Sequence, residues 1–124
     1  MDHVEKLKDF LKTNPADSFV QHALALEYIK IGKDAQARKL FEDILNREPG
    51  YIGSYYHLAK LLENMGEKQL AISWYEKGMA AAKQAKDNHA YNELQGAYED
   101  LVYWFANFAN NNTMQGYKFA REKR

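Results

Sequence analysis

The chain of 124 residues contains no cysteine, so disulfides, thiolate metal sites and cysteine nucleophiles are excluded, while the redox compartment stays open. It has only 2 prolines and 7 glycines, and alanine, leucine, lysine and glutamate are frequent; this balance favours helices over strands. No apolar run approaches a membrane span, and the charged amino-terminal segment lacks the apolar stretch of a signal peptide. We therefore expect a cytoplasmic protein with no membrane partner.

The sequence also lacks an excess of charge of one sign. Its 17 basic and 17 acidic side chains balance, so overall charge favours neither nucleic acid nor a membrane surface. The distribution is uneven, because residues 109–124 form a basic tail that contains Lys118, Arg121, Lys123 and Arg124 against Glu122. A basic terminus is usually solvated, and no groove-wide basic patch accompanies it, so we do not expect nucleic acid as the main partner.

Patterns of catalytic and metal-binding residues are absent as well. The sequence has no glycine-rich phosphate loop and no glycine-flanked serine of the nucleophile-elbow type. Adjacent carboxylates such as Glu42 and Asp43 diverge on a helix and do not converge as an acid–base pair. The four histidines lack metal-ligand spacing, and His22 and His57, even if close together, make a poor metal site without a carboxylate. We predict no enzyme, no cofactor and no metal.

What the sequence does contain is an internal repeat. The pairs that recur 34 residues apart are Leu24 and Leu58, Ala25 and Ala59, Gly32 and Gly66, Ala37 and Ala71, Phe41 and Tyr75, and Pro15 and Pro49. Apolar residues recur at helical spacing on both sides of the glycine, which can take the left-handed geometry of a helix end. Each unit is therefore predicted to be a pair of helices. The alanines allow a close helix crossing, and the aromatic residues fill the space beside it.

This pattern resembles the tetratricopeptide repeat, which reads Trp-x2-Leu-Gly-x2-Tyr, then Ala-x3-Phe, then Pro. The first unit has Gln21, Leu24, Ala25, Tyr28, Ala37, Phe41 and Pro49; the second has Tyr55, Leu58, Ala59, Leu62, Ala71 and Tyr75. The second unit departs from the pattern at Lys83, where proline would fall, so its second helix is expected to continue to about Lys86. The resemblance covers roughly residues 3–101, and the layout is similar to that of small stand-alone bacterial tetratricopeptide proteins.

The fold that the resemblance implies is an all-α superhelix, a right-handed helix-turn-helix solenoid of about two and a half repeats and six helices. Within a repeat domain of residues 1–108, we expect a half-repeat cap at 1–15, repeats at 18–51 and 52–86, and a third-repeat or capping helix at 88–108. Asp87-Asn88 is a plausible start for this last helix. Residues 109–124 form the tail.

The resemblance also implies a binding surface, because the first helix of each pair lines the concave side in this family. The positions that map to this side are His22, Leu26, Ile29, Lys30, Tyr56, His57, Lys60, Glu63, Asn64 and Asn92. A groove of mixed polarity suits an extended peptide or a helix of a partner protein. The function predicted is therefore a scaffold or adaptor that binds a protein without catalysis. The lysine–asparagine clamp for carboxylate tails is not present, since His22, Leu26 and His57 stand there.

Other interpretations of these residues stay open. Phe19, Leu26 and Ile29 are equally compatible with the core, and Tyr56, Lys60 and Glu63 with an ordinary solvated face. Three aromatic residues lie past the recognisable repeat, where no partner helix is encoded: Trp104, Phe105 and Phe108. The tail, a second copy in a homodimer, or another protein would cover them. The alternatives to groove binding are thus a self-associating structural module and an RNA-contacting accessory protein that uses the basic tail.

Overall fold

The structure, a computed structural model, describes residues 2–111, of which residues 109–111 are described as helical backbone only. These residues form six helices and no strand, which confirms the all-helical prediction. The helices are α1 (His3–Thr13), α2 (Ser18–Lys30), α3 (Asp34–Arg47), α4 (Gly53–Asn64), α5 (Lys68–Gln84) and α6 (Asn88–Asn111). The basic tail beyond Asn111 lies outside the described residues.

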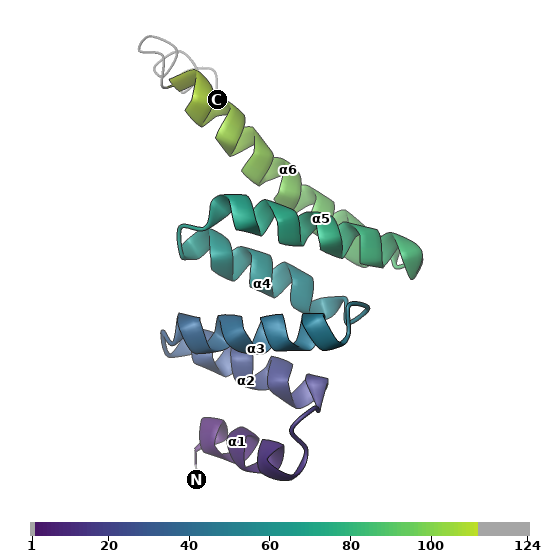
Figure 1. The fold of residues 1–124 in the computed structure, drawn as a ribbon. Coiled ribbons are helices and arrows are strands. Elements are labelled where there is room, and N and C mark those ends of the chain that lie inside the picture. The colour runs from purple at the N-terminus through teal and green to yellow at the C-terminus, as the bar shows by residue number, and fades with distance from the viewer. Residues whose placement is uncertain (1, 112–124) are drawn as a thin grey trace.

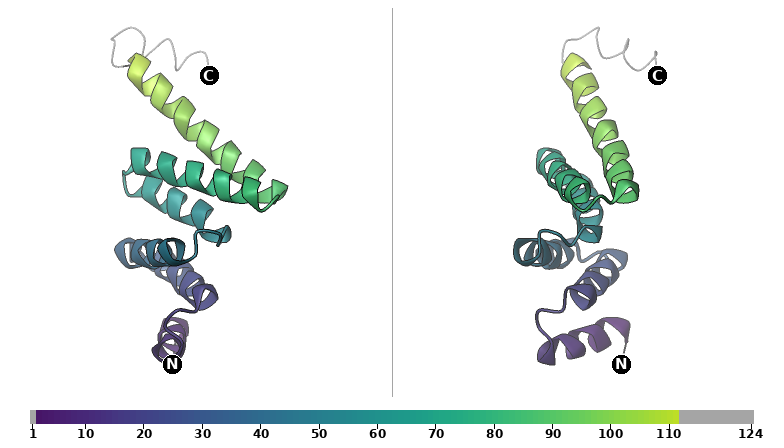
Figure 2. Two further views of the ribbon diagram at one scale, coloured as in Figure 1. Left: turned by 45° about the vertical axis from the view of Figure 1, so that its right-hand side comes forward. Right: turned by 90° about the vertical axis from the view of Figure 1, so that its right-hand side faces the viewer.

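The helices stack one after another in chain order, from α1 at one end to α6 at the other (Figure 1). Each helix packs mainly against its neighbours in sequence, which is the contact pattern of a solenoid. Seen from the side, α2, α4 and α6 lie in one layer and α3 and α5 in the other (Figure 2). The predicted α-α superhelix of about two and a half repeats is therefore confirmed.

Glycines end the first helix of each pair, as the sequence predicts. Gly32 and Gly66 have φ angles of 79° and 84°, in the left-handed region that glycine adopts without strain. The amide of Lys33 donates to the carbonyl of Tyr28 at 2.8 Å, and the amide of Glu67 donates to Leu62 in the same way. These bonds satisfy carbonyls that the helix end would otherwise leave unpaired.

The turn between α5 and α6 repeats this geometry without a glycine. Lys86 has a φ angle of 58°, and the amide of Asp87 donates to the carbonyl of Ala82 at 2.9 Å. Helix α5 ends at Gln84, close to the predicted Lys86, and has 17 residues against 14 in α3. Asp87 caps α6, since its carboxylate accepts a hydrogen bond from the amide of Ala90 at 3.0 Å.

The core runs as a continuous column between the two layers. The four repeat alanines, Ala25, Ala37, Ala59 and Ala71, are completely buried. Phe41 and Tyr75 are also completely buried, and Tyr28 is partly buried against the same core. The structure thus has small residues where the helices cross and large aromatic residues beside these crossings, as the sequence predicts.

One further close approach was not visible in the repeat pattern. A Cβ atom placed on Gly78 of α5 would lie 2.7 Å from Cβ of Tyr55 on α4 and 3.1 Å from Cδ1 of Leu94 on α6. Gly78 therefore lets α5 contact α4 and α6 at the same point. Helix α6 is the longest, and its carboxyl-terminal end extends beyond α5 (Figure 1). None of the helices in the described range is long and apolar enough to cross a bilayer.

Candidate functional site

The surface of the α2, α4 and α6 layer, called here the inner face, contains all ten predicted partner-binding residues. Each of them is exposed or half-buried, and none belongs to the fully buried core: His22, Leu26, Ile29, Lys30, Tyr56, His57, Lys60, Glu63, Asn64 and Asn92. The structure therefore brings these residues to one layer of the molecule. Their part in partner binding remains a prediction.

Two histidines meet where α2 packs on α4. His22 Nδ1 lies 2.8 Å from Oγ of the buried Ser54, and the rings of His22 and His57 are 5.3 Å apart. Burial and then the nearby charge of His57 lower the pKa of His22 to about 4. Burial also lowers the pKa of His57, although the carboxylate of Glu93 partly opposes this shift. Both rings are thus neutral at pH 7, and His22 serves as a hydrogen-bonding contact between helices.

The centre of the inner face is a polar row on α4. The carboxylate of Glu63 accepts a hydrogen bond from the hydroxyl of Tyr75, and its Oε2 lies 3.7 Å from Nζ of Lys60. Burial, this hydrogen bond and nearby carboxylates, including Asp100 of α6, raise the pKa of Tyr75 well above its usual value. Tyr75 therefore stays protonated and holds Glu63 in place. Tyr56 completes the row, with its ring edge-on to His57 at 5.8 Å.

The α2 end of the inner face has less surface that a partner could contact. Leu26 and Ile29 are partly buried and pack against the core, so the structure favours the core interpretation for these two residues. Lys30 lies 2.9 Å from Glu27, which also contacts His3 of α1 at 3.2 Å. Phe19 is 75% exposed, so the core interpretation is wrong for this residue.

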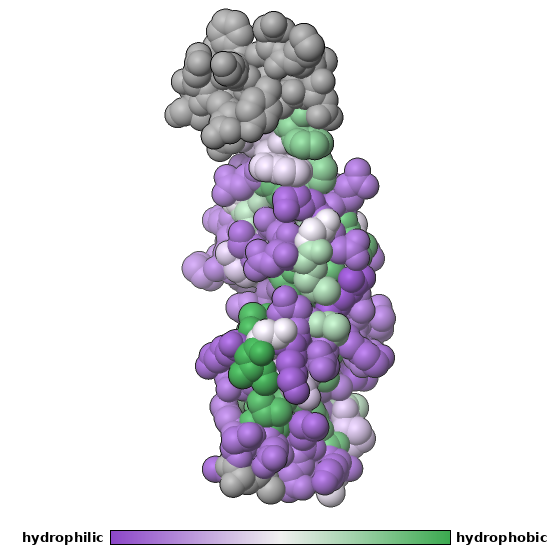
Figure 3. All heavy atoms as spheres, turned by 90° about the vertical axis from the view of Figure 1, so that its left-hand side faces the viewer, coloured by the Kyte–Doolittle hydropathy of each residue, from purple (hydrophilic) through white to green (hydrophobic). Residues whose placement is uncertain are grey.

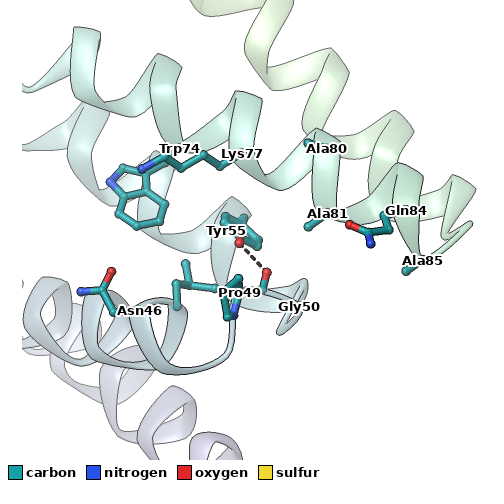
Figure 4. A pocket seen from close by; sticks show the side chains of 11 residues that line it. Asn46, Pro49, Gly50, Tyr55, Trp74, Lys77, Ala80, Ala81, Gln84 and Ala85 are labelled. Carbon is teal, nitrogen blue, oxygen red and sulfur yellow. Dashed lines mark hydrogen bonds between the residues drawn. The ribbon is translucent and has the colours of Figure 1, made fainter.

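A groove that sequence reasoning missed lies on the opposite layer, between α3 and α5 and above α4 (Figure 4). This α3–α5 groove has a volume of about 710 Å³. Its lining residues come from the end of α3, the following turn, α4 and α5: Leu45, Asn46, Pro49, Gly50, Tyr55, Trp74, Lys77, Ala80, Ala81, Gln84 and Ala85. The run of small residues that follows Trp74 in α5 was the available sequence signal.

Three side chains fix the shape of the α3–α5 groove. The hydroxyl of Tyr55 donates a hydrogen bond to the carbonyl of Pro49, which fixes its ring at the bottom of the groove (Figure 4). The rings of Tyr55 and Trp74 are 6.1 Å apart. Nζ of Lys77 lies 4.5 Å from the centre of the Trp74 ring, in the geometry of a cation–π contact.

Comparison with known proteins shows the family to which this chain belongs. A sequence profile described as tetratricopeptide repeat matches residues 52–84. A tetratricopeptide repeat domain protein of Salinibacter ruber is 35% identical in a match that covers 69% of this chain and 96% of that one, with a TM-score of 0.67. The chain belongs to the tetratricopeptide repeat family.

Two further comparisons cover different shares of the matched proteins. A protein of Bordetella parapertussis shares the fold, at 24% identity and a TM-score of 0.74, over 86% of this chain and 92% of that one. The mouse interferon-induced protein with tetratricopeptide repeats 3 is 22% identical over 99 residues, which are 80% of this chain. This chain spans 24% of the length of that curated relative.

The tetratricopeptide stack leaves aromatic residues uncovered at the end of α6. Trp104 and Phe108 are 39% and 48% exposed, and their rings stack at 5.3 Å. Phe105, by contrast, is partly buried against the core. Nζ of Lys68 lies 5.0 Å from the centre of the Trp104 ring. The tail that sequence analysis offered as one cover for this aromatic surface lies outside the described residues.

Apolar surface also appears elsewhere. On the side that holds the α2–α3 and α4–α5 turns, it gathers in the lower half, at the level of α1 to α3, among hydrophilic side chains (Figure 3). Ile31, at the α2–α3 turn, is 56% exposed. Among the described residues, no group of three or more histidine, aspartate or glutamate side chains is arranged to hold a metal ion.

Proposed function

We propose that this tetratricopeptide chain binds a segment of a partner protein on its inner face, without catalysis. Tetratricopeptide domains generally mediate protein–protein interactions and act as non-catalytic scaffolds. The observation that carries the proposal is the fixed polar row on α4, where Tyr75 and Lys60 both hold the carboxylate of Glu63. A surface that is ordered before its partner arrives loses less conformational entropy on binding.

The chemistry of the row fits the main chain and side chains of a bound peptide. Lys60 is exposed and donates, Glu63 accepts, and the half-buried ring of Tyr56 offers an apolar face beside them. Asn92 of α6 is exposed in the same layer and adds an amide that can both donate and accept. Aromatic residues flanked by polar groups are common at protein interfaces.

The test is capture of proteins from the native source, identified by mass spectrometry. The double variant Tyr56→Ala/Lys60→Ala should lose the captured partner, while its circular dichroism spectrum keeps the helical signal. The variant Lys83→Ala changes an exposed residue of α5 that lies outside both the inner face and the α3–α5 groove lining, and it serves as the control. Equal capture by the wild-type chain and the inner-face variant would sink the proposal.

Self-association through the aromatic surface of α6 is a second candidate function. It is favoured by the exposure of the stacked pair Trp104 and Phe108 at an end of the solenoid. Solenoids normally end in a polar face, and an apolar end therefore invites a partner. Light scattering at two concentrations should detect a dimer that the variant Trp104→Ser/Phe108→Ser does not form. A wild-type chain that is monomeric at both concentrations would remove this candidate.

A further inference from the structure

The α3–α5 groove has the form of a peptide site on the face opposite to the inner face. Its lining on α5 extends from Trp74 to Ala85, which corresponds to about 16 Å of helix and so to about five residues of extended chain. Helices α3 and α5 both pack on α4, and the floor between them is therefore apolar, with Leu45, Tyr55 and Ala81. A volume of about 710 Å³ lies in the range of ordinary ligand sites.

The polar groups of the groove are available to an occupant. Asn46 and Gln84 lie toward opposite ends of the groove (Figure 4), and neither side-chain amide forms a hydrogen bond within residues 2–108. Amides in such positions can pair with the main chain of an extended peptide. The hydroxyl of Tyr55, in contrast, already bonds to Pro49, so only its ring faces the occupant.

The charge of the groove favours an occupant that carries negative charge. Lys77 is the single charged residue in the lining, and it makes no ion pair with any described residue. Its ammonium is held over the Trp74 ring at 4.5 Å, which fixes its position while its hydrogen-bond donors stay free. A carboxylate of the occupant would form a charge-assisted hydrogen bond with it.

The hollow one repeat earlier shares an apolar floor but differs in its charges. It lies between α1 and α3 above α2, has a volume of about 460 Å³, and has an apolar floor that includes Leu11, Leu24 and Leu40. Its charged lining residues are mostly basic: Lys8, Lys12, Lys39 and Asp43. Asp43 stands there at the repeat position of Lys77 and pairs with Lys39 at 3.8 Å, so a lysine at this position distinguishes the α3–α5 groove.

We propose that the α3–α5 groove binds an extended acidic peptide segment of a partner protein, with an apolar side chain on the Leu45–Tyr55–Ala81 floor and a carboxylate on Lys77. This site is separate from the inner face, so one partner segment would lie on each side of the solenoid. The proposal does not depend on what the inner face binds.

Trp74 provides a direct readout. The chain has 2 tryptophans, and Trp104→Phe leaves Trp74 as the only tryptophan of the full-length protein, so selective excitation of tryptophan reports on this residue. The probes are three synthetic ten-residue peptides with a central Leu-Leu pair, flanked by aspartates, by asparagines or by lysines. We expect the aspartate peptide to change Trp74 emission in a saturable way. Its dissociation constant should be at least tenfold lower than those of the asparagine and lysine peptides.

Two variants and their controls decide the outcome. Lys77→Glu should weaken binding of the aspartate peptide at least tenfold, and Lys77→Met should weaken this binding less. Lys83→Glu makes the same charge change on α5 outside the lining and should leave the binding unchanged. The inner-face variant Tyr56→Ala/Lys60→Ala should also bind the peptide normally, which separates this site from the proposed function. Equal binding of all three peptides would overturn the proposal, as would equal effects of Lys77→Glu and Lys83→Glu. A Trp74 signal that depends on protein concentration alone would instead assign the groove to a second copy.

Discussion

At the scale of single residues, two positions in α5 and its turn are under opposite constraints. Gly78 is a helix-interior residue that lacks a side chain because Tyr55 and Leu94 occupy the space. Lys86 has a side chain where the backbone geometry favours glycine. At each position we can therefore predict whether a substitution raises or lowers stability, and helix propensity alone would give the wrong direction.

Gly78→Ala should lower the free energy of unfolding by about 1–3 kcal/mol, although alanine is the better helix former. The reason is overpacking, since the added methyl group would lie 2.7 Å from Cβ of Tyr55. Urea unfolding followed by circular dichroism measures the change. Gly96→Ala is the matched control, because no atom lies within 4 Å of a Cβ at this position of α6; it should stabilise the chain by about 1 kcal/mol. Stabilisation by both alanines would contradict the close contact.

Lys86→Gly should raise the free energy of unfolding by about 0.5–1 kcal/mol. Its φ angle of 58° is left-handed, which costs an ordinary residue more than glycine. Urea unfolding measures this change as well. Gly66→Ala is the converse substitution, because it adds a side chain at a residue with a φ angle of 84°. The two substitutions should shift the unfolding midpoint in opposite directions, and a shift in the same direction would contradict the turn geometry.

At the scale of helix pairs, the contact between α2 and α4 should respond to pH. The folded-state pKa of His22 is lowered to about 4, below its unfolded value, so the unfolded chain binds more protons between about pH 4 and pH 6.5. Stability supplied by the neutral ring is present above about pH 6.5 and is lost as the pH falls toward 4. His57, whose pKa is also lowered, adds to this loss, while Glu93 opposes it.

The measurement is the urea midpoint at pH 7.5 and pH 5.0. We expect a lower midpoint at pH 5.0 for the wild-type chain and a smaller difference for His22→Gln, because glutamine does not titrate. The double variant His22→Gln/His57→Gln should have the smallest difference of the three. An unchanged pH dependence in the double variant would show that other groups, such as carboxylates, control it.

At the scale of the whole molecule, stability should be graded along the stack. Helix α1 has no buried residue, whereas α4 has six and contacts helices on both sides. In a solenoid each unit is stabilised mainly by its neighbours, so an end helix opens more easily than a central one. Hydrogen exchange measured by mass spectrometry should therefore show at least tenfold faster exchange in α1 than in α4. Uniform protection would contradict the graded stack.

The fold and the two binding surfaces were predictable from the sequence to different degrees. The repeat of Leu24, Gly32 and Ala37 at the next unit predicts helix pairs and their ends, since helix ends and crossings depend on local residue type. The α3–α5 groove was not predicted, because its lining joins residues from three helices whose spacing depends on packing. Phe19 shows the same limit, as periodicity alone left it open between core and surface.

The sequence by itself determined the helices, their order and the buried alanines, because these follow from local propensity and a 34-residue period. Only the tertiary structure decided that His22 pairs with Ser54, that Tyr75 holds Glu63, and that Lys77 stands over Trp74 above an apolar floor. These contacts join different helices, and their geometry is set by how closely neighbouring helices approach, which no single helix encodes.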